Sequence, residues 1–373
     1  MENVKMIRNE YMEELNEGYC FPEKFALRGE AFFKEYVFEL GFAVPDLKPE
    51  NLKDKAVRRC RFCGRGEPDT TFKNEAHLLP ELLGRHNLIS DFECDQCNKY
   101  FKSFEDHLSN YLGFGRTLLS ILGKEKVPKF KSVDKKMQME SKRDSDGNIN
   151  VEVERFSGDD LSFEFDETQD LVTVTAKKHT YIPGIVYKSF LKMALSSLAE
   201  RDLIDYRETF RYLRNGFPLS VTGGFMVVNK YTMAYTFCYE RPAVLLFRKR
   251  NPTAKLFTHM FVLFAINNIY QLALPLNTKD RWFYGQKMDF PLIPPIFGGG
   301  GYSFPYETIV PFVEDFSSIE QRKREEESFR FKVPLAQYKI PAHTNPDTGE
   351  FILEHFDPKM IKSIIFQGRY PLE

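Results

Sequence analysis

Three short segments determine how this part of the chain folds. They are C-R-F-C-G at residues 60–64, N-E-A-H-L-L-P-E-L-L-G at residues 74–84 and C-D-Q-C-N-K-Y-F at residues 94–101. The first and last segments each hold a Cys-x-x-Cys pair, which can turn two thiolates onto one ion. A redox dithiol uses one such pair, whereas two pairs complete a tetrahedral zinc with no open position. We therefore expect a structural zinc that keeps folded a segment with little core of its own. Its ligands are the four paired cysteines, Cys60, Cys63, Cys94 and Cys97.

The middle segment and its surroundings hold the residues that suggest chemistry. Glu75 and His77 precede an apolar Leu-Leu-Pro turn, Asn87 follows, and Asn98 comes directly after the last cysteine. This order of cysteines, acid, His, Leu-Gly and Cys-x-x-Cys-Asn resembles the HNH endonuclease family. The resemblance is to the bacterial version in which a zinc ribbon holds a ββα-metal finger together, and it covers residues 60–105 of the 373-residue chain.

The resemblance implies a metal-dependent hydrolysis of DNA phosphodiester bonds. His77 matches the general base that takes a proton from the attacking water, and the ordinary imidazole pKa of about 6.5 suits that role. Asn87 matches the residue that orients this base. Asn98 matches a ligand of one divalent cation, Mg²⁺ or Mn²⁺, which stabilises charge on the scissile phosphate and the leaving oxygen.

The sequence departs from the commonest family pattern at the catalytic metal. Ala76 stands where many members have a metal-binding Asp or His, and Glu75 lies one step earlier. Asn98 stands where His is common. Glu105 lies seven residues after Asn98, hence on the same face of the expected helix, and is the candidate carboxylate ligand. The alternatives are an N-cap role for Asn98 and ordinary exposed glutamates at the other two positions.

Composition and periodicity divide the chain into three expected parts with an overall α+β fold. Residues 1–55 form a helical N-terminal cap, because Phe32, Tyr36 and Leu40 follow a helical spacing. Residues 56–143 form the HNH nuclease domain, which ends at the turn sequence D-S-D-G-N. Residues 150–373 form a larger α+β domain of unknown role, with an antiparallel sheet and two helices near residues 183–198 and 203–213.

Positive charge is concentrated around the expected finger, although the whole chain carries a net charge of −1. A phosphate backbone selects such a distribution, and a solvated linker is the alternative. The candidate nucleic-acid-binding residues are Arg58, Arg59, Arg61, Arg65, Lys129 and Lys131.

Cysteine usage and hydropathy bear on the setting of the protein. Four of the six cysteines are in the two pairs, which is typical of metal ligands in a reducing cytoplasm rather than of disulfides. No apolar stretch of about 18 residues is present, so no membrane partner is expected. The expected partner is DNA, and RNA as a second substrate and a homo-oligomer are left open.

Two functions compete at this point. The first is an HNH endonuclease, with a further expectation of a role in restriction or anti-phage defence. The second is a zinc-ribbon nucleic-acid-binding protein without catalysis, which the departures at Ala76 and Asn98 favour. Two other segments are expected to carry no chemistry. The glycine run 298–301 lacks the Lys-Ser/Thr of a phosphate loop, and residues 320–327 are interpreted as a solvated helix of mixed charge.

Overall fold

The structure, a computed structural model, describes residues 4–7, 19–42, 58–84, 86, 88–123, 126–143, 148–156, 162–166, 168–215, 226–232, 242–255, 258–265, 268–283, 310–332, 340–344, 351–354 and 363–369.

The chain divides into two compact units, each built from two separate stretches of sequence. Unit 1 contains residues 1–108 and 182–320, and unit 2 contains residues 109–181 and 321–373. The fold class is α+β with antiparallel sheets, as the sequence predicts. Among the described helices, none combines the length and the apolar character that crossing a membrane requires.

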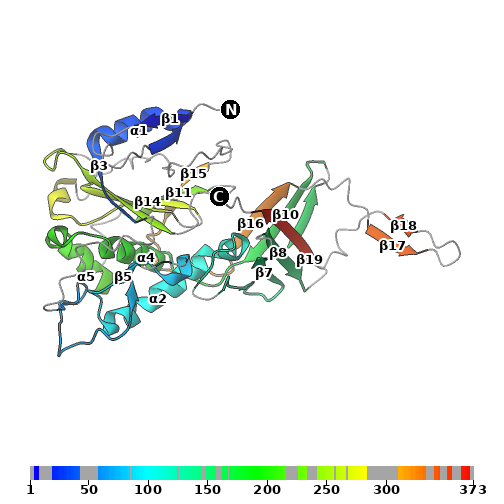
Figure 1. Cartoon of the computed structure of the whole chain (residues 1–373), viewed down its shortest axis with the longest axis horizontal. Helices are drawn as coiled ribbons and strands as arrows, with labels where there is room; N and C mark the ends of the chain where they lie inside the picture. The colour runs from blue at the N-terminus through cyan, green and yellow to red at the C-terminus, as the bar shows by residue number, and fades with distance from the viewer. Residues whose placement is uncertain are drawn as a thin grey trace. The chain divides into compact units, whose positions relative to one another are not determined.

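Unit 1 is organised around a six-stranded antiparallel sheet in the order β15-β11-β14-β13-β12-β3 (Figure 1). Every residue of β14 is buried, because helices cover both faces of the sheet. On one face, Phe32 of α1 packs against Phe247, with ring centroids 5.4 Å apart. On the other face, Phe190 of α4 packs against Tyr270 at 5.1 Å. The strands are β3 (Tyr36–Phe42), β11 (Val227–Thr232), β12 (Ala243–Lys249), β13 (Met260–Ala265), β14 (Ile269–Ala273) and β15 (Val310–Asp315).

The remaining elements of unit 1 include the two helices predicted after residue 183. Pro183 occupies the first turn of α4, where its fixed φ suits a helix start. The second predicted helix is split, because a 3-10 segment precedes α5. These elements are β1 (Val4–Ile7), β2 (Tyr19–Pro22), α1 (Glu23–Glu35), β4 (Ala76–His77), η3 (Glu81–Leu83), β5 (Ile89–Ser90), α2 (Asp95–Leu112), α4 (Pro183–Ser196), η4 (Glu200–Tyr206), α5 (Arg207–Asn215) and η6 (Thr278–Phe283).

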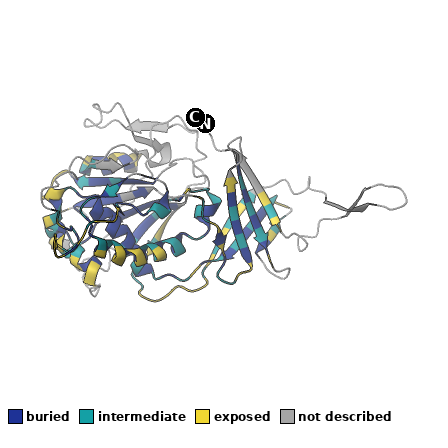
Figure 2. Cartoon of the chain, turned by 60° about the horizontal axis from the view of Figure 1, so that its bottom comes forward, coloured by how far each residue is buried: buried dark blue, intermediate teal, exposed yellow. Residues whose placement is uncertain are grey.

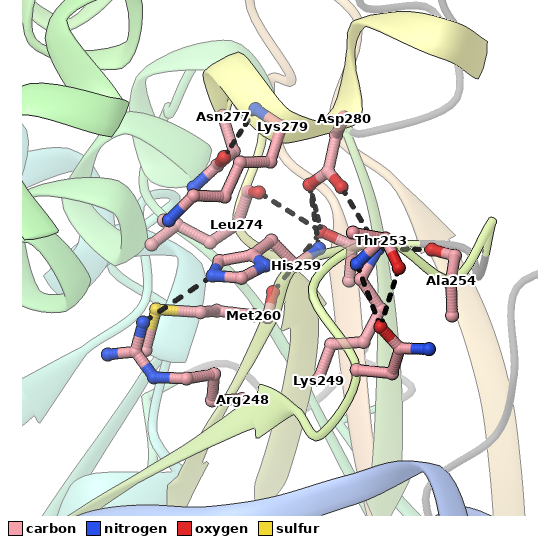
Figure 3. Close-up of polar contacts among 12 residues, drawn as sticks. Arg248, Lys249, Thr253, Ala254, His259, Met260, Leu274, Asn277, Lys279 and Asp280 are labelled. Carbon is pink, nitrogen blue, oxygen red and sulfur yellow. Dashed lines mark hydrogen bonds and ion pairs between the residues drawn. The ribbon is translucent and has the colours of Figure 1, made fainter.

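A buried polar network lies at the β12–β13 end of this sheet (Figure 3). The Asp280 carboxylate accepts the His259 backbone N–H at 2.6 Å and lies 3.5 Å from Lys249 Nζ. Arg248 Nη1 lies 3.4 Å from His259 Nε2, and its guanidinium also pairs with Asp202 at 2.6 Å. Ion pairs within this network thus compensate the charges of Asp280, Lys249 and Arg248, which a buried charge requires.

Unit 2 consists of a four-stranded sheet, β19-β8-β7-β6, and a three-stranded sheet, β16-β10-β9, around one apolar core (Figure 2). Alternation along β10 places Val172, Val174 and Ala176 in this core and leaves Thr173 and Thr175 outside. The elements are α3 (Gly115–Leu118), β6 (Phe130–Lys131), β7 (Met137–Arg143), β8 (Asn148–Arg155), β9 (Phe163–Asp166), β10 (Leu171–Lys177), β16 (Glu326–Lys332), β17 (Ile340–Thr344), β18 (Phe351–Glu354) and β19 (Ser363–Arg369).

The expected domain boundary near residues 144–150 is wrong. The strands on either side of it, β7 and β8, pair with each other in register from Met137↔Arg155 to Arg143↔Ile149. The D-S-D-G-N sequence therefore connects two strands of one sheet, because the same turn residues serve hairpins and linkers alike. The division between units falls instead inside α2, after Leu108, and again before Ile182.

Two further expectations are corrected. Among residues 4–7 and 19–42, which the structure describes in the N-terminal part, the helix is α1 alone, and Tyr36 begins strand β3, where its hydroxyl donates to the Thr258 carbonyl at 2.9 Å. Phe32 and Tyr36 still stack at 4.8 Å, so the helical spacing reflects a real contact across the end of α1. Residues 320–327 are not helical, and their last two residues begin β16, in which Phe329 and Phe331 pack against the core of unit 2. The glycine run 298–301 lies outside the described residues.

Candidate metal centre and active site

The four paired cysteines converge on one point, as predicted. Their Sγ atoms all lie within 4.8 Å of one another, and those of Cys63 and Cys94 are 3.7 Å apart. Tetrahedral Zn–S bonds of about 2.3 Å place neighbouring sulfurs about 3.8 Å apart, so the cluster fits one such ion. Three of the four residues are buried, and Cys63 is half-buried.

Each pair is held by its own local structure. In the first knuckle, the Gly64 N–H donates to the Cys60 carbonyl at 2.7 Å, and Gly64 adopts a φ of +72°, which favours glycine. In the second, the Cys94 carbonyl accepts the Asn98 N–H at 2.9 Å and begins helix α2. The Cys97 thiol, together with the Cys94 backbone N–H, lowers the pKa of Cys60 to about 4. This network favours the thiolate of Cys60, which is the form that binds a metal, whereas the hydrogen bond with Cys60 raises the pKa of Cys97 and burial raises that of Cys94.

Asp95 ties the metal cluster to the strand that carries His77. Its carboxylate accepts the Thr71 hydroxyl and the backbone N–H groups of Lys73 at 3.1 Å and Asn74 at 2.8 Å. The Thr71 hydroxyl and these N–H groups lower the pKa of Asp95 to about 2. Helix α2 begins here, three residues earlier than predicted, so Asn98 lies within its first turn and is not its N-cap.

His77 is the last residue of β4 and lies on a short β-hairpin that leads into α2. It pairs with Ile89 of β5, and the Leu78 N–H donates to the Leu88 carbonyl at 3.0 Å. The imidazole is half-buried, with Nε2 3.7 Å from Glu81 Oε1. Glu81 lies four residues after His77 and was not predicted as a site residue, although the His-x-x-x-Glu spacing could have indicated it.

A second histidine supports the His77 ring. His86 is buried, and its ring meets that of His77 edge to face at 5.4 Å. Its Nδ1 accepts the Leu88 N–H at 3.2 Å. Burial, with a smaller contribution from His77, lowers the pKa of His86 to about 4, so this ring is uncharged near neutral pH.

A buried ion pair contacts the backbone of His77. Lys192 Nζ, on α4, donates to the His77 carbonyl oxygen at 2.7 Å and lies 3.0 Å from Glu93 Oε2. The Lys192 side chain is 4% exposed and that of Glu93 0%. Burial raises the pKa of Glu93, and Lys192 opposes the rise. The sequence signal for this pair was weak, because Lys192 is one of two lysines within the apolar run of α4.

The candidate metal-binding residues differ in position. Glu105 is half-buried on α2, and burial raises its pKa, opposed by Lys192 and reinforced by Glu93, Asp106 and Glu81. Its carboxylate thus interacts with the charged residues around His77. Asn98 is half-buried, seven residues earlier on the same helix. Glu75 is exposed just before β4, and Asn87 lies outside the described residues.

The basic candidates separate into different environments. Arg61 is buried, and its Nη1 donates to the carbonyls of Leu195 at 3.1 Å, Ser196 at 3.0 Å and Leu198 at 2.9 Å. This guanidinium satisfies the C-terminal end of α4 and is not accessible to a phosphate, which corrects its expected role. Burial lowers the pKa of Arg61 to about 10.

The other basic candidates stay closer to the surface. Arg58 and Arg59 donate to carbonyls of the adjoining loop, those of Phe72 at 3.5 Å and Gly64 at 3.4 Å. A hydrogen bond to Cys63 raises the pKa of Arg65, so its guanidinium lies against the cysteine cluster. Lys129 and Lys131 belong to unit 2.

The fold and the site together define an α+β protein with a four-cysteine metal centre beside a strand–strand–helix finger. Residues 60–112 match the family model described as HNH endonuclease. This match confirms the resemblance that the cysteine and histidine pattern indicates. No curated protein and no solved structure matches the chain.

Proposed function

We propose that this protein is a metal-dependent HNH endonuclease that hydrolyses DNA phosphodiester bonds. The observation that carries the proposal is the position of His77. It ends the first strand of a hairpin whose return strand leads into the cysteine-anchored helix α2, within the segment that matches the HNH model. The order β4, β5, α2 is that of a ββα finger.

In this proposal the His77 imidazole takes the proton from the attacking water. The Lys192 hydrogen bond holds the backbone of His77, and the His86 ring limits the rotation of its side chain. The Glu81 carboxylate, at 3.7 Å, favours the imidazolium that forms on proton transfer. Asn87 retains its proposed orienting role.

The proposed cofactors are a structural zinc and a catalytic Mg²⁺ or Mn²⁺. An all-cysteine ligand set of this spacing suits zinc. Oxygen ligands suit the divalent cation, and Glu105 and Asn98 on α2 would hold it, with Glu81 as an additional carboxylate and Glu75 as the exposed alternative. When bound, this cation would supply charge stabilisation at the scissile phosphate and the leaving oxygen.

For the DNA backbone we propose contacts by Arg58, Arg59 and Arg65 of unit 1 and by Lys129 and Lys131 of unit 2, without Arg61. A role in restriction or anti-phage defence is part of the proposal and rests on the family resemblance alone. Plating efficiency of phages on cells with and without the active protein tests that role.

The proposed cleavage is tested with the His77→Ala protein. With plasmid DNA and Mg²⁺ or Mn²⁺, this change should lower the cleavage rate on the order of 10² to 10⁴-fold, because it removes the proton acceptor. Folding and DNA affinity should stay close to those of the parent, and Gln96→Ala, an exposed change on α2, is the matched control. Equal rates for the His77→Ala protein and the parent would show that His77 is not the base.

The second candidate is a zinc-ribbon module that binds nucleic acid without cutting it. Ala76 favours it, because this residue is buried and offers no ligand where the family often has one. A parent protein that cuts neither DNA nor RNA, whichever divalent ion is supplied, yet binds DNA in a salt-dependent way, would establish this alternative.

A further inference from the structure

A small pocket in unit 2 is lined by cations and by no acidic residue. It has a volume of about 140 Å³ and lies between the last turn of α2, helix α3 and residues 128–131. Its charged and polar side chains belong to Ser109, Asn110, Arg116, Thr117, Lys129, Lys131 and His179. Binding pockets for whole small molecules typically measure about 300 to 1,000 Å³, so this one has room for a single charged group.

Arg116 is the unusual residue of this pocket. Its Nη1 donates to the Ser109 hydroxyl at 3.0 Å, and its Nε is buried with no hydrogen-bond partner among the described residues. No carboxylate of the described chain forms an ion pair with it. Burial alone lowers the pKa of Arg116 to about 10. A guanidinium removed from water in this way is costly unless an anion compensates it.

Two other arginines with little-exposed side chains, both in unit 1, show the contrast. Arg248 pairs with Glu39 at 3.1 Å and with Asp202 at 2.6 Å. Arg61 donates to three backbone carbonyls and lies 3.6 Å from the centre of the Phe92 ring. Arg116 differs from these two arginines: its acceptor among the described residues is the Ser109 hydroxyl, it has no carboxylate partner there, and it lines a pocket.

The two lysines reinforce the positive charge of the pocket. Lys131 is exposed, and the His179 ring, through Nε2, lies 2.9 Å from its backbone carbonyl. Lys129 pairs with Glu140 at 2.8 Å at the surface. Such exposed pairs contribute little, so Lys129 can exchange Glu140 for another anion at small cost.

We propose that this pocket binds a phosphate group, with the Arg116 guanidinium as its anchor and Lys129 and Lys131 as flanking cations. Arginine offers several N–H donors in a planar fork that matches phosphate oxygens. The group belongs either to a nucleic-acid backbone or to free phosphate. In the first case the inference rests on the proposed function and adds Arg116 to its DNA contacts.

The test compares Arg116→Gln with its parent, both in the full-length His77→Ala chain so that DNA stays intact. Fluorescence anisotropy of a DNA duplex gives the affinity at several salt concentrations, and thermal melting is followed in potassium phosphate and in potassium chloride of equal ionic strength. Loss of one backbone contact should lower the slope of log affinity against log salt by about one. Phosphate should raise the melting temperature of the parent and leave that of Arg116→Gln unchanged.

The two arms identify the source of the phosphate. A change in the DNA arm assigns the pocket to the backbone, and a change in the melting arm alone assigns it to free phosphate. Arg330→Gln, an exposed change on β16 outside the pocket, should behave as the parent in both arms. Without phosphate, Arg116→Gln should melt no lower than the parent, because it removes an uncompensated buried charge.

Lys131→Gln provides a second variant at an exposed position that folding does not depend on. If Lys131→Gln and Arg116→Gln both bind DNA and respond to phosphate as the parent does, the pocket has no such ligand. Failure of the proposed nuclease gives a different result. A chain with His77 intact that cuts no DNA overturns that function alone, whereas phosphate-dependent melting that requires Arg116 still supports the pocket.

Discussion

At the scale of single residues, Lys192 connects the core of unit 1 to the proposed catalytic histidine. Its ammonium group is buried, and it has two partners: the His77 carbonyl at 2.7 Å and Glu93 at 3.0 Å. A backbone carbonyl fixed by a buried donor has little freedom, and the position of the attached imidazole follows it. Lys192 therefore acts as a positioning residue, because it reaches the site only through the backbone of His77.

We expect Lys192→Met to destabilise the protein by about 3 to 5 kcal/mol, because Glu93 is left buried without its partner. The double variant Lys192→Met with Glu93→Leu should recover much of this loss, since apolar pairs often replace buried ion pairs at no cost. Urea unfolding measures both effects.

Cleavage kinetics separate positioning from stability in the same two proteins. In the stable double variant, kcat should remain lower than that of the parent by a factor on the order of 10 to 10², because small displacements of a catalytic group have effects of that size. KM should change little, because Lys192 is buried. A double variant that is stable and cuts as fast as the parent would make Lys192 a packing residue only.

At the scale of elements, the cysteine cluster fixes the start of helix α2 against two loops. Cys94 and Cys97 lie on either side of the first residues of α2, and Asp95 between them holds the chain at residues 71–74. That loop leads directly into β4. The metal centre thus sets the position of His77 relative to α2, although it does not touch the imidazole.

Metal analysis should find about one zinc per chain. Removal of that ion with a chelator should abolish cleavage even when Mg²⁺ is then supplied in excess, because the hairpin and α2 lose their common anchor. Hydrogen exchange should show the loss of protection in residues 58–112. Zn²⁺ added back should restore cleavage, and Mg²⁺ alone should not. Full activity in a chain shown to be free of zinc would contradict a structural role for the cluster.

At the scale of the whole molecule, two buried histidines make stability depend on pH. Burial, with Lys279, Arg248 and Lys249 adding to it, lowers the pKa of His259 to about 4, and the pKa of His86 is lowered to about 4 as well. The unfolded chain takes up these protons from about pH 6.5 downward, whereas the folded chain does so only near pH 4. The free energy of unfolding should therefore fall as the pH falls from 6.5 to 4.

His259→Gln isolates one of these contributions. Gln can accept from Arg248 in place of Nε2 but does not titrate, so the slope of unfolding free energy against pH should become shallower between pH 6.5 and 4. The slope should change by at most about 1.4 kcal/mol per pH unit, which is the contribution of one proton. Urea unfolding at several pH values measures it, with His179→Gln, an exposed position, for comparison. An unchanged slope would show that His259 does not stay neutral in the folded chain.

The sequence by itself determined the metal centre and the class of the finger. Cys-x-x-Cys pairs constrain their own local geometry, so four cysteines in this order predict convergence without knowledge of the rest of the fold. The placement of His77 before a turn, and of a helix after the second pair, followed in the same way. Local patterns also predicted the helix α4, because the period of burial is a local property.

Tertiary structure decided the features that depend on distant partners. No local feature of the sequence distinguishes Arg61 from Arg59, two residues earlier. Arg61 donates to carbonyls at the C-terminal end of α4, whereas Arg59 is exposed. Lys192 and Glu93 are 99 positions apart by number and meet only because α4 packs beside the hairpin. The division into units also depends on pairing between strands, since β7 pairs with β8 and the chain passes between units inside α2. The roles of these side chains depend on their burial and on their pairing with residues far away in the sequence. Local sequence patterns give neither the burial nor the partner.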